Sequence, residues 1–95
     1  MHTLARKRVW GYGANAKGAV LLQASGLTAS TIERIVDDSE SKQGLLMPGT
    51  DIPITDALDL SAPDILAILS WNNAEELKAK AKARGFQGRF FLPHD

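Results

Sequence analysis

Two glycines and a lysine near the start of the chain have the types and spacing to bind a phosphate. They belong to the stretch RVWGYGANAKG, residues 8–18, in which an apolar run ends at Gly11 and Gly13 and Lys17 follows. Glycine lets the backbone approach a phosphate, and a helix that starts just after it offers free N–H groups and partial positive charge. Gly11, Gly13 and Ala16 also fit G-x-G-x-x-G/A, the dinucleotide-binding fingerprint. Taken alone, the loop is equally compatible with phosphate binding and with a tight turn beside a solvated lysine.

Acidic and amide side chains follow at positions that could complete a ligand site. Asp37 and Asp38 come about 20 residues later, where the fingerprint places an acid that binds the ribose. For Asp37 this role and that of a solvated carboxylate are balanced alternatives, whereas for Asp38 the solvated carboxylate is favoured. Lys42 and Gln43, followed by a glycine, put a cation, an amide and a flexible backbone into one loop that could close over a ligand. On residue chemistry alone, an ordinary surface loop is the favoured interpretation.

Side chains able to form a catalytic or metal site are scarce in this sequence. The chain has no cysteine, which excludes disulfides, thiolate metal ligands and cysteine nucleophiles. Its histidines, His2 and His94, lie near the two ends, where a catalytic or metal-binding role would require an anchored terminus. We therefore expect a binding unit without catalytic or metal-ligating residues of its own.

The charge and hydropathy of the chain bear on its partners and location. Its formal net charge is zero, which argues against broad attraction to nucleic acid or to an acidic membrane. No apolar run reaches the roughly 20 residues of a membrane span. The start, MHTLARKR, has no apolar core behind its charges, so we expect no signal peptide and a cytoplasmic protein.

Short apolar runs alternate with helical segments along the chain. This order predicts an α/β fold, a small Rossmann-like three-layer domain with a mostly parallel sheet of about four to five strands. Residues 1–95 are expected to form a single domain. The expected strands are 7–13, 34–38, 51–54, 63–71 and 88–93, and the expected helices are 16–26 and 72–85.

Capping signals define the ends of both expected helices. Asn15 is a candidate N-cap of the first helix and Gly26 its C-terminal stop. Because that helix carries apolar residues on most of its circumference, we expect it to be well buried. Asn72 is expected to cap the second helix, with Glu75 three residues later at the capping-box position.

Four sequence blocks resemble the C-terminal domain of S-adenosylmethionine-dependent C-methyltransferases, a family that includes enzymes acting on nucleotide-linked deoxysugars. The blocks are GYGANAKG (11–18), KQGLLMPGTDIPI (42–54), LSWNNAEEL (69–77) and GRFFLP (88–93). Together they cover nearly the whole chain, in order and at compatible spacing, which makes them far more specific than the glycine loop alone. The chain departs from the family pattern at Ala19-Val20, Leu45-Leu46 and Ser70, which bears on sugar-nucleotide specificity more than on the fold.

The resemblance implies a substrate-binding domain that is inactive alone and works with a catalytic methyltransferase domain in cis or in trans. It places S-adenosylmethionine and zinc in family domains that this chain lacks, so no cofactor is expected here. The substrate would be a nucleotide-linked sugar or another phosphorylated molecule, with Lys17 and Lys42 neutralising phosphate and Asp37 accepting from a sugar hydroxyl or a base. The expected substrate contacts are Tyr12, Gly13, Asn15, Lys17, Gly18, Asp37, Lys42, Gln43 and Asn72, although an N-cap role ranks first for Asn72.

Two alternatives from other classes stay open at this point. The first is a free-standing module that binds NAD or a mononucleotide through the glycine loop. A single small βαβ half lacks the second half that normally completes a dinucleotide site, which makes NAD less favoured than a mononucleotide or a diphosphate. The second is a protein-interaction domain, which exposed Trp10, Trp71 or Phe90 would favour, although their positions in the pattern indicate core residues.

Overall fold

The computed structural model describes residues 7–92, without the side chain of Trp71. His2, His94 and the end of the last predicted strand at Pro93 lie outside the described residues. Within the described range the elements follow the predicted order. They are β1 (Val9–Tyr12), α1 (Ala16–Ser25), β2 (Arg34–Val36), β3 (Ile54–Thr55), β4 (Ile65–Ile68), a 3₁₀ turn η2 (Trp71–Asn73), α2 (Ala74–Ala83) and β5 (Arg89–Phe91).

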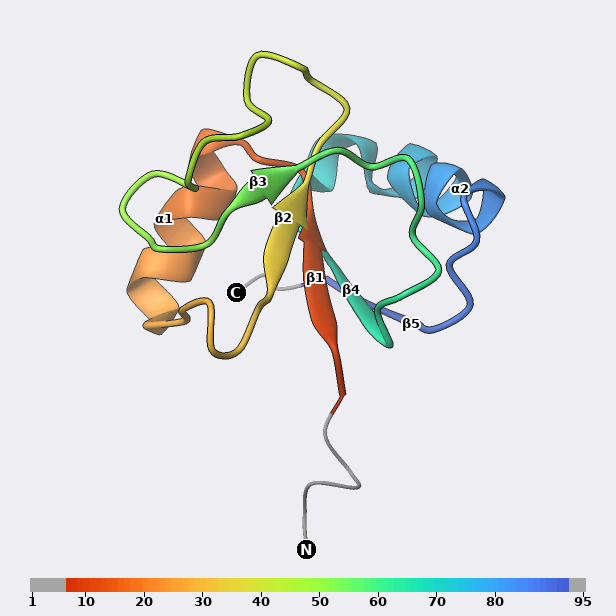
Figure 1. The fold of residues 1–95 in the computed structure, drawn as a ribbon, viewed down its shortest axis with the longest axis horizontal. Helices are drawn as coiled ribbons and strands as arrows, with labels where there is room; N and C mark the ends of the chain where they lie inside the picture. Colours follow the sequence, from red (N-terminus) through yellow and green to blue (C-terminus); the bar gives the residue numbers. More distant parts are fainter. Residues whose placement is uncertain (1–6, 93–95) are drawn as a thin grey trace, which may run out of the picture.

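The strands form one parallel sheet in the order β3-β2-β1-β4-β5. The chain moves from β1 toward β2 in one direction and from β4 toward β5 in the other. Because such crossovers are right-handed, α1 and α2 cover opposite faces of the sheet (Figure 1). This arrangement confirms the expected Rossmann-like domain of three layers. The short β3 follows Pro53 at one edge of the sheet, as the restriction on proline requires.

Strand residues alternate between two cores, one on each face of the sheet. Trp10 and Tyr12 pack with α2, whereas Ile35 and Ala67 pack with α1. Gly11 lies between Trp10 and Tyr12 inside β1, and a Cβ there would stand 2.6 Å from Ile35 Cδ1. The missing side chain of Gly11 thus makes room for the core beneath α1. Trp10 is a core residue, as its strand position indicated.

The helix α1 has the predicted ends but not the predicted burial. Asn15 caps it, and Gly26 ends it in the left-handed conformation with φ of 71°. Only Gly18, Ala19 and Leu22 are buried, and the Val20 residue is 65% exposed. The expectation of a well-buried helix is therefore wrong within residues 7–92, because the rest of the domain covers only one stripe of the apolar surface of α1.

The start of α2 also differs from the prediction. The residue at the N-cap position is Asn73, because η2 occupies the place where Asn72 was expected to cap. Asn73 makes no side-chain cap, since its Oδ1 accepts a hydrogen bond from Ser70 Oγ at 2.6 Å instead. Neither α1 nor α2 is long and apolar enough to cross a membrane, and the same holds for every helix among residues 7–92.

Candidate functional site

The loop after β1 lies at the carboxyl edge of the sheet, beside the loop after β4. These two strands are neighbours whose chains depart to opposite faces, and ligands of open parallel sheets bind at this crevice. Gly13 turns the chain with φ of 107°, and its N–H donates to the carbonyl of Val36 at 3.0 Å. A Cβ on Gly13 would stand 3.0 Å from that of Ser70. Close packing of the two loops therefore requires glycine at this position.

The first turn of α1 sits directly on the end of β4. Asn15 Oδ1 accepts from the amide of Gly18 at 2.7 Å, which satisfies one of the free N–H groups of the helix. A Cβ on Gly18 would lie 3.0 Å from Leu69 Cβ, so this glycine permits the close approach of helix to strand. Ala16, which the fingerprint placed in that role, is exposed. Since Gly11 is also a strand residue, the dinucleotide fingerprint does not describe this loop.

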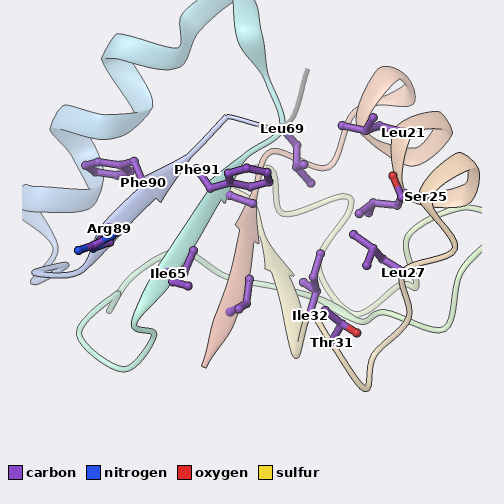
Figure 2. A pocket seen from close by; sticks show the side chains of 13 residues that line it. Leu21, Ser25, Leu27, Thr31, Ile32, Ile65, Leu69, Arg89, Phe90 and Phe91 are labelled. Carbon is purple, nitrogen blue, oxygen red and sulfur yellow. The ribbon is translucent and has the colours of Figure 1, made fainter. Parts of the chain in front are cut away.

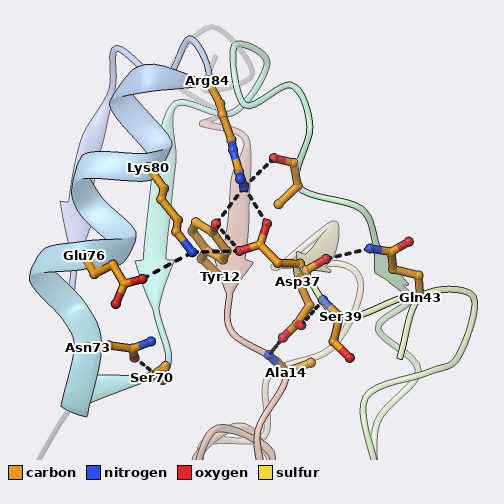
Figure 3. Close-up of polar contacts among 12 residues, drawn as sticks. Tyr12, Ala14, Asp37, Ser39, Gln43, Ser70, Asn73, Glu76, Lys80 and Arg84 are labelled. Carbon is orange, nitrogen blue, oxygen red and sulfur yellow. Dashed lines mark hydrogen bonds and ion pairs between the residues drawn. The ribbon is translucent and has the colours of Figure 1, made fainter. Parts of the chain in front are cut away.

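Asp37 holds the glycine loop in place. Its Oδ2 accepts from the amide of Ala14 at 2.7 Å and its Oδ1 from the amide of Ser39 at 2.8 Å (Figure 3). Each oxygen of this carboxylate thus already accepts a backbone hydrogen bond. The role of Asp37 toward a sugar hydroxyl or a base remains a prediction, whereas its carboxylate holds the loops at Ala14 and Ser39 in the structure.

The loop that carries Lys42 and Gln43 folds back onto the same edge. Lys42 Nζ donates to the carbonyl of Ala14 at 2.8 Å, and Gln43 Nε2 donates to the carbonyl of Asp37 at 2.9 Å. Lys17 is exposed in the first turn of α1. The Lys42 ammonium is therefore fixed beside the start of α1 and a second lysine lies in its first turn, where the helix dipole already favours an anion. Distant segments meet here because the parallel strands end at one edge.

Comparison with known proteins identifies the fold's family. The model of the C-methyltransferase C-terminal domain matches residues 2–94. The chain belongs to this family. It is 39% identical over 92 residues to the C-methyltransferase NovU of Streptomyces niveus, a match that covers 92% of this chain and 21% of that relative. The chain thus spans about a fifth of the length of the curated relative, and the resemblance inferred from the four sequence blocks is confirmed.

The structure of this C-methyltransferase C-terminal domain gathers most, but not all, of the predicted site residues. Hydrogen bonds or close packing join the two neighbouring loops and the first turn of α1 into one cluster. Its members are Gly13, Asn15, Gly18, Asp37, Lys42 and Gln43, with Lys17 beside them. Asn72 is exposed in the turn after β4 and caps no helix.

Tyr12 does not fit the predicted role of substrate contact. The residue is 1% exposed and its side chain packs in the core beneath α2. Its hydroxyl donates to Asp38 Oδ2 at 2.9 Å and accepts from Arg84 Nη1 at 2.9 Å. Burial, reinforced by the Asp38 carboxylate, raises the pKa of the Tyr12 hydroxyl well above its ordinary value. Tyr12 is therefore a neutral, fully engaged core residue of the C-methyltransferase C-terminal domain.

Arg84 was absent from the sequence-based site, and Asp38 was expected to be solvated. Arg84 Nη1 donates to Asp38 Oδ1 at 2.6 Å and to the carbonyl of Ala57 at 3.0 Å, while Lys80 Nζ lies 3.6 Å from Asp38 Oδ2 (Figure 3). This cluster fastens α2 to the ends of β1 and β2. Because Arg84 is 46 residues from Asp38 and 72 from Tyr12, no local pattern could have revealed it.

The Asp38 cluster makes the stability of the domain depend on pH. Burial opposes ionisation, but hydrogen bonds from Arg84 and Tyr12 outweigh it and lower the pKa of Asp38 below 3.8. The stabilisation is therefore complete above the ordinary pKa and disappears as the pH falls through the lowered one. Because the Asp38 side chain is 41% exposed, we expect Asp38→Asn to cost about 1 kcal/mol near neutral pH and almost nothing in strong acid.

Urea unfolding of the wild type and of Asp38→Asn, measured across the acid range, checks this expectation. Glu40→Gln is the matched control, because Glu40 is exposed and its side chain forms no hydrogen bond or ion pair with any of residues 7–92. A stability gap between wild type and Asp38→Asn that stays constant with pH would contradict the assignment.

Proposed function

We propose that this C-methyltransferase C-terminal domain binds the phosphate groups of a nucleotide-linked sugar, or of another phosphorylated substrate, at the carboxyl edge of its sheet. The observation that carries the proposal is the position of Lys42. Its ammonium group lies 2.8 Å from the carbonyl of Ala14, directly before the first turn of α1. The Lys42 ammonium has two further N–H donors, and a phosphate at the start of α1 would lie within their reach.

Electrostatics favour an anion at this position over a neutral ligand. The first N–H groups of a helix have no partner within the helix, and here only that of Gly18 is satisfied by the Asn15 side chain. No hydrogen-bond acceptor for the amides of Ala16 and Lys17 is found among residues 7–92. A phosphate would receive these amides together with the charges of Lys17 and Lys42, as in other anion sites at helix N-termini.

Methyl transfer itself is assigned to another part of the enzyme in this proposal. The described residues around the loop provide cations, amides and one carboxylate that is already hydrogen bonded to the backbone. They suit binding and orientation of a substrate. A catalytic methyltransferase domain, in cis or in trans, would bind S-adenosylmethionine and carry out the reaction on the substrate held here.

A nuclear magnetic resonance titration of the isotope-labelled chain tests the proposal. A thymidine diphosphate sugar, added to saturation, should shift the amide signals of residues 13–18 and 42–44. S-Adenosylmethionine at the same concentrations should leave them unchanged. The proposal fails if the nucleotide sugar shifts none of these amides, or if S-adenosylmethionine binds tightly at the same edge.

NAD provides the comparison with the dinucleotide-binding alternative. Because Gly11 lies within β1 and the Asp37 oxygens accept from Ala14 and Ser39, we expect NAD to bind no better than a simple diphosphate. A clear preference for NAD would favour that alternative instead.

A further inference from the structure

A cleft of about 400 Å³ lies on the α1 face of the sheet. It runs between α1 and β5, along β4 and the following residue from Ile65 to Leu69 (Figure 2), and reaches Val9 of β1. Most of its lining side chains are apolar, among them Leu21, Leu27, Ile32, Ile65, Leu69 and Phe91. Among residues 7–92, Arg89 is the one charged residue in the lining. The cleft is therefore an apolar surface with a single cationic group.

The path of the chain explains why this face is open. The helix α1 and the segment 37–53 lie over β1, β2 and β3, whereas α2 covers the other face. Among residues 7–92, no helix covers the α1 face of β5, and α1 covers β4 only near Ala67 and Leu69. Parallel sheets are normally covered on both faces, because their strands are apolar on both. An uncovered parallel face next to an edge strand indicates a missing layer.

The residue types in α1 and β5 also indicate that a covering layer is missing from this face. The sequence of α1 is apolar around most of its circumference, a pattern typical of helices buried on several sides. Yet the Val20 residue is 65% exposed and the Phe91 residue 56% exposed. Phe91 points into the cleft, while its neighbour Phe90 points toward α2 (Figure 2). Of these two residues, Phe91 lines the cleft, so a large aromatic side chain lies exposed there.

The family supplies the polypeptide that could cover it. A C-terminal domain follows the rest of its protein, and the matched segment is 21% of the relative's length. The preceding polypeptide would enter this domain at Lys7, which lines a small hollow together with Asp64, Ile65 and Arg89. Ile65 and Arg89 also line the cleft. Lys7, where the described part of the chain begins, therefore lies beside the open face.

We propose that this cleft docks an amphipathic helix of the preceding methyltransferase domain, with apolar side chains against Phe91 and Leu27 and an acidic side chain near Arg89. The inference rests on the proposed presence of that catalytic domain. It concerns a different surface from the substrate edge, so that docking on the cleft leaves Lys17 and Lys42 open to substrate.

Thiol labelling tests the docking, because the chain has no cysteine of its own. Phe91→Cys places a thiol in the cleft, and Glu75→Cys places the control on α2, where the side chain is 89% exposed. Each variant is made in the 95-residue chain and in a hybrid NovU protein whose C-terminal segment is replaced by this chain. Labelling by a maleimide is followed peptide by peptide with mass spectrometry.

The hybrid should label position 91 about tenfold or more slowly than the free chain, because the core of an interface excludes water and reagent. Position 75 should change less than about twofold. Equal labelling at position 91 in both proteins would overturn the proposal. Labelling at position 91 that slows as the free chain is concentrated would also overturn it, since a second copy would then be the occupant.

Two further arrangements keep the test decisive. If the hybrid does not fold, the same two cysteines at the matching positions of intact NovU should show slow labelling in the cleft and fast labelling on α2; equal rates would refute the docking. The nucleotide-sugar titration reads amides at the other surface. If the nucleotide sugar shifts no amides but position 91 is protected in the hybrid, substrate binding is refuted and docking is not. If the amides shift but position 91 is labelled equally in both proteins, docking is refuted and substrate binding is not.

Discussion

Replacing Gly13 by alanine is expected to lower the free energy of unfolding by about 3 kcal/mol, the largest stability effect of a single added methyl group in the glycine loop. A φ of 107° is a conformation that side chains rarely adopt. The added Cβ would also stand 3.0 Å from Ser70 Cβ and 3.3 Å from the Ser70 backbone nitrogen. Both the backbone strain and the collision between the two loops contribute. Urea unfolding followed by the fluorescence of the buried Trp10 measures the loss.

Two companion variants separate these contributions. Gly26→Ala has a φ of 71° and nothing within 4 Å of the added Cβ, so it should cost only about 1 kcal/mol of strain. Ser70→Gly removes the Cβ that the new methyl group meets. In the double variant it should recover the part of the Gly13→Ala loss that comes from packing. If Gly13→Ala costs no more than Gly26→Ala, the two loops do not pack as the structure indicates.

Removing both Lys17 and Lys42 is expected to weaken binding of the thymidine diphosphate sugar by about 100-fold. Each charge-assisted hydrogen bond contributes about 1.5–3 kcal/mol, and 1.4 kcal/mol corresponds to tenfold in affinity. Lys42→Met should have the larger single effect, because its ammonium is fixed by the carbonyl of Ala14, whereas Lys17 is exposed. Isothermal calorimetry at constant ionic strength measures the affinities.

The matched control for charge is Lys82→Met. Lys82 lies on α2, on the opposite face of the sheet from α1, where its ammonium stands 5.9 Å from the ring centre of Phe90. Its loss should leave the affinity unchanged. Lys42→Met also removes a hydrogen bond to the loop, so its unfolding free energy is measured alongside. Equal weakening by Lys82→Met and Lys42→Met would mean that net charge, and not this site, attracts the ligand.

The order and type of the elements could be predicted because they depend on neighbours in sequence. The unbroken apolar run of residues 65–68 is typical of a strand covered on both faces, and it forms the centre of the sheet with β1. Asn15 and Gly26 act on the helix that lies between them, so their local chemistry fixed its ends. The four blocks also sufficed to place the chain among C-methyltransferase C-terminal domains.

The predictions that failed depend on contacts between distant segments. Asn72 has a side chain of a type that often caps helices, but the η2 turn after β4 places Asn73 at the N-cap position instead. Tyr12 lies between Gly11 and Gly13 in the sequence, yet the alternation of β1 directs its ring into the core beneath α2, where Arg84 donates a hydrogen bond to its hydroxyl. Ala16 matched the fingerprint, but the residue of α1 that closely approaches the end of β4 is Gly18, where a Cβ would lie 3.0 Å from Leu69 Cβ.

The sequence by itself determined the fold class, the ends of α1 and the family, because propensity, capping and a series of short motifs are properties of local stretches. The tertiary structure alone decided which of the predicted site residues share one edge and what each already binds. In the folded domain the carboxylate of Asp37 accepts a hydrogen bond from Ala14 in the glycine loop, Lys42 donates to the carbonyl of Ala14, and Arg84 pairs with Asp38. Parallel strands bring their carboxyl ends together regardless of separation along the chain, and only that geometry sets these distances.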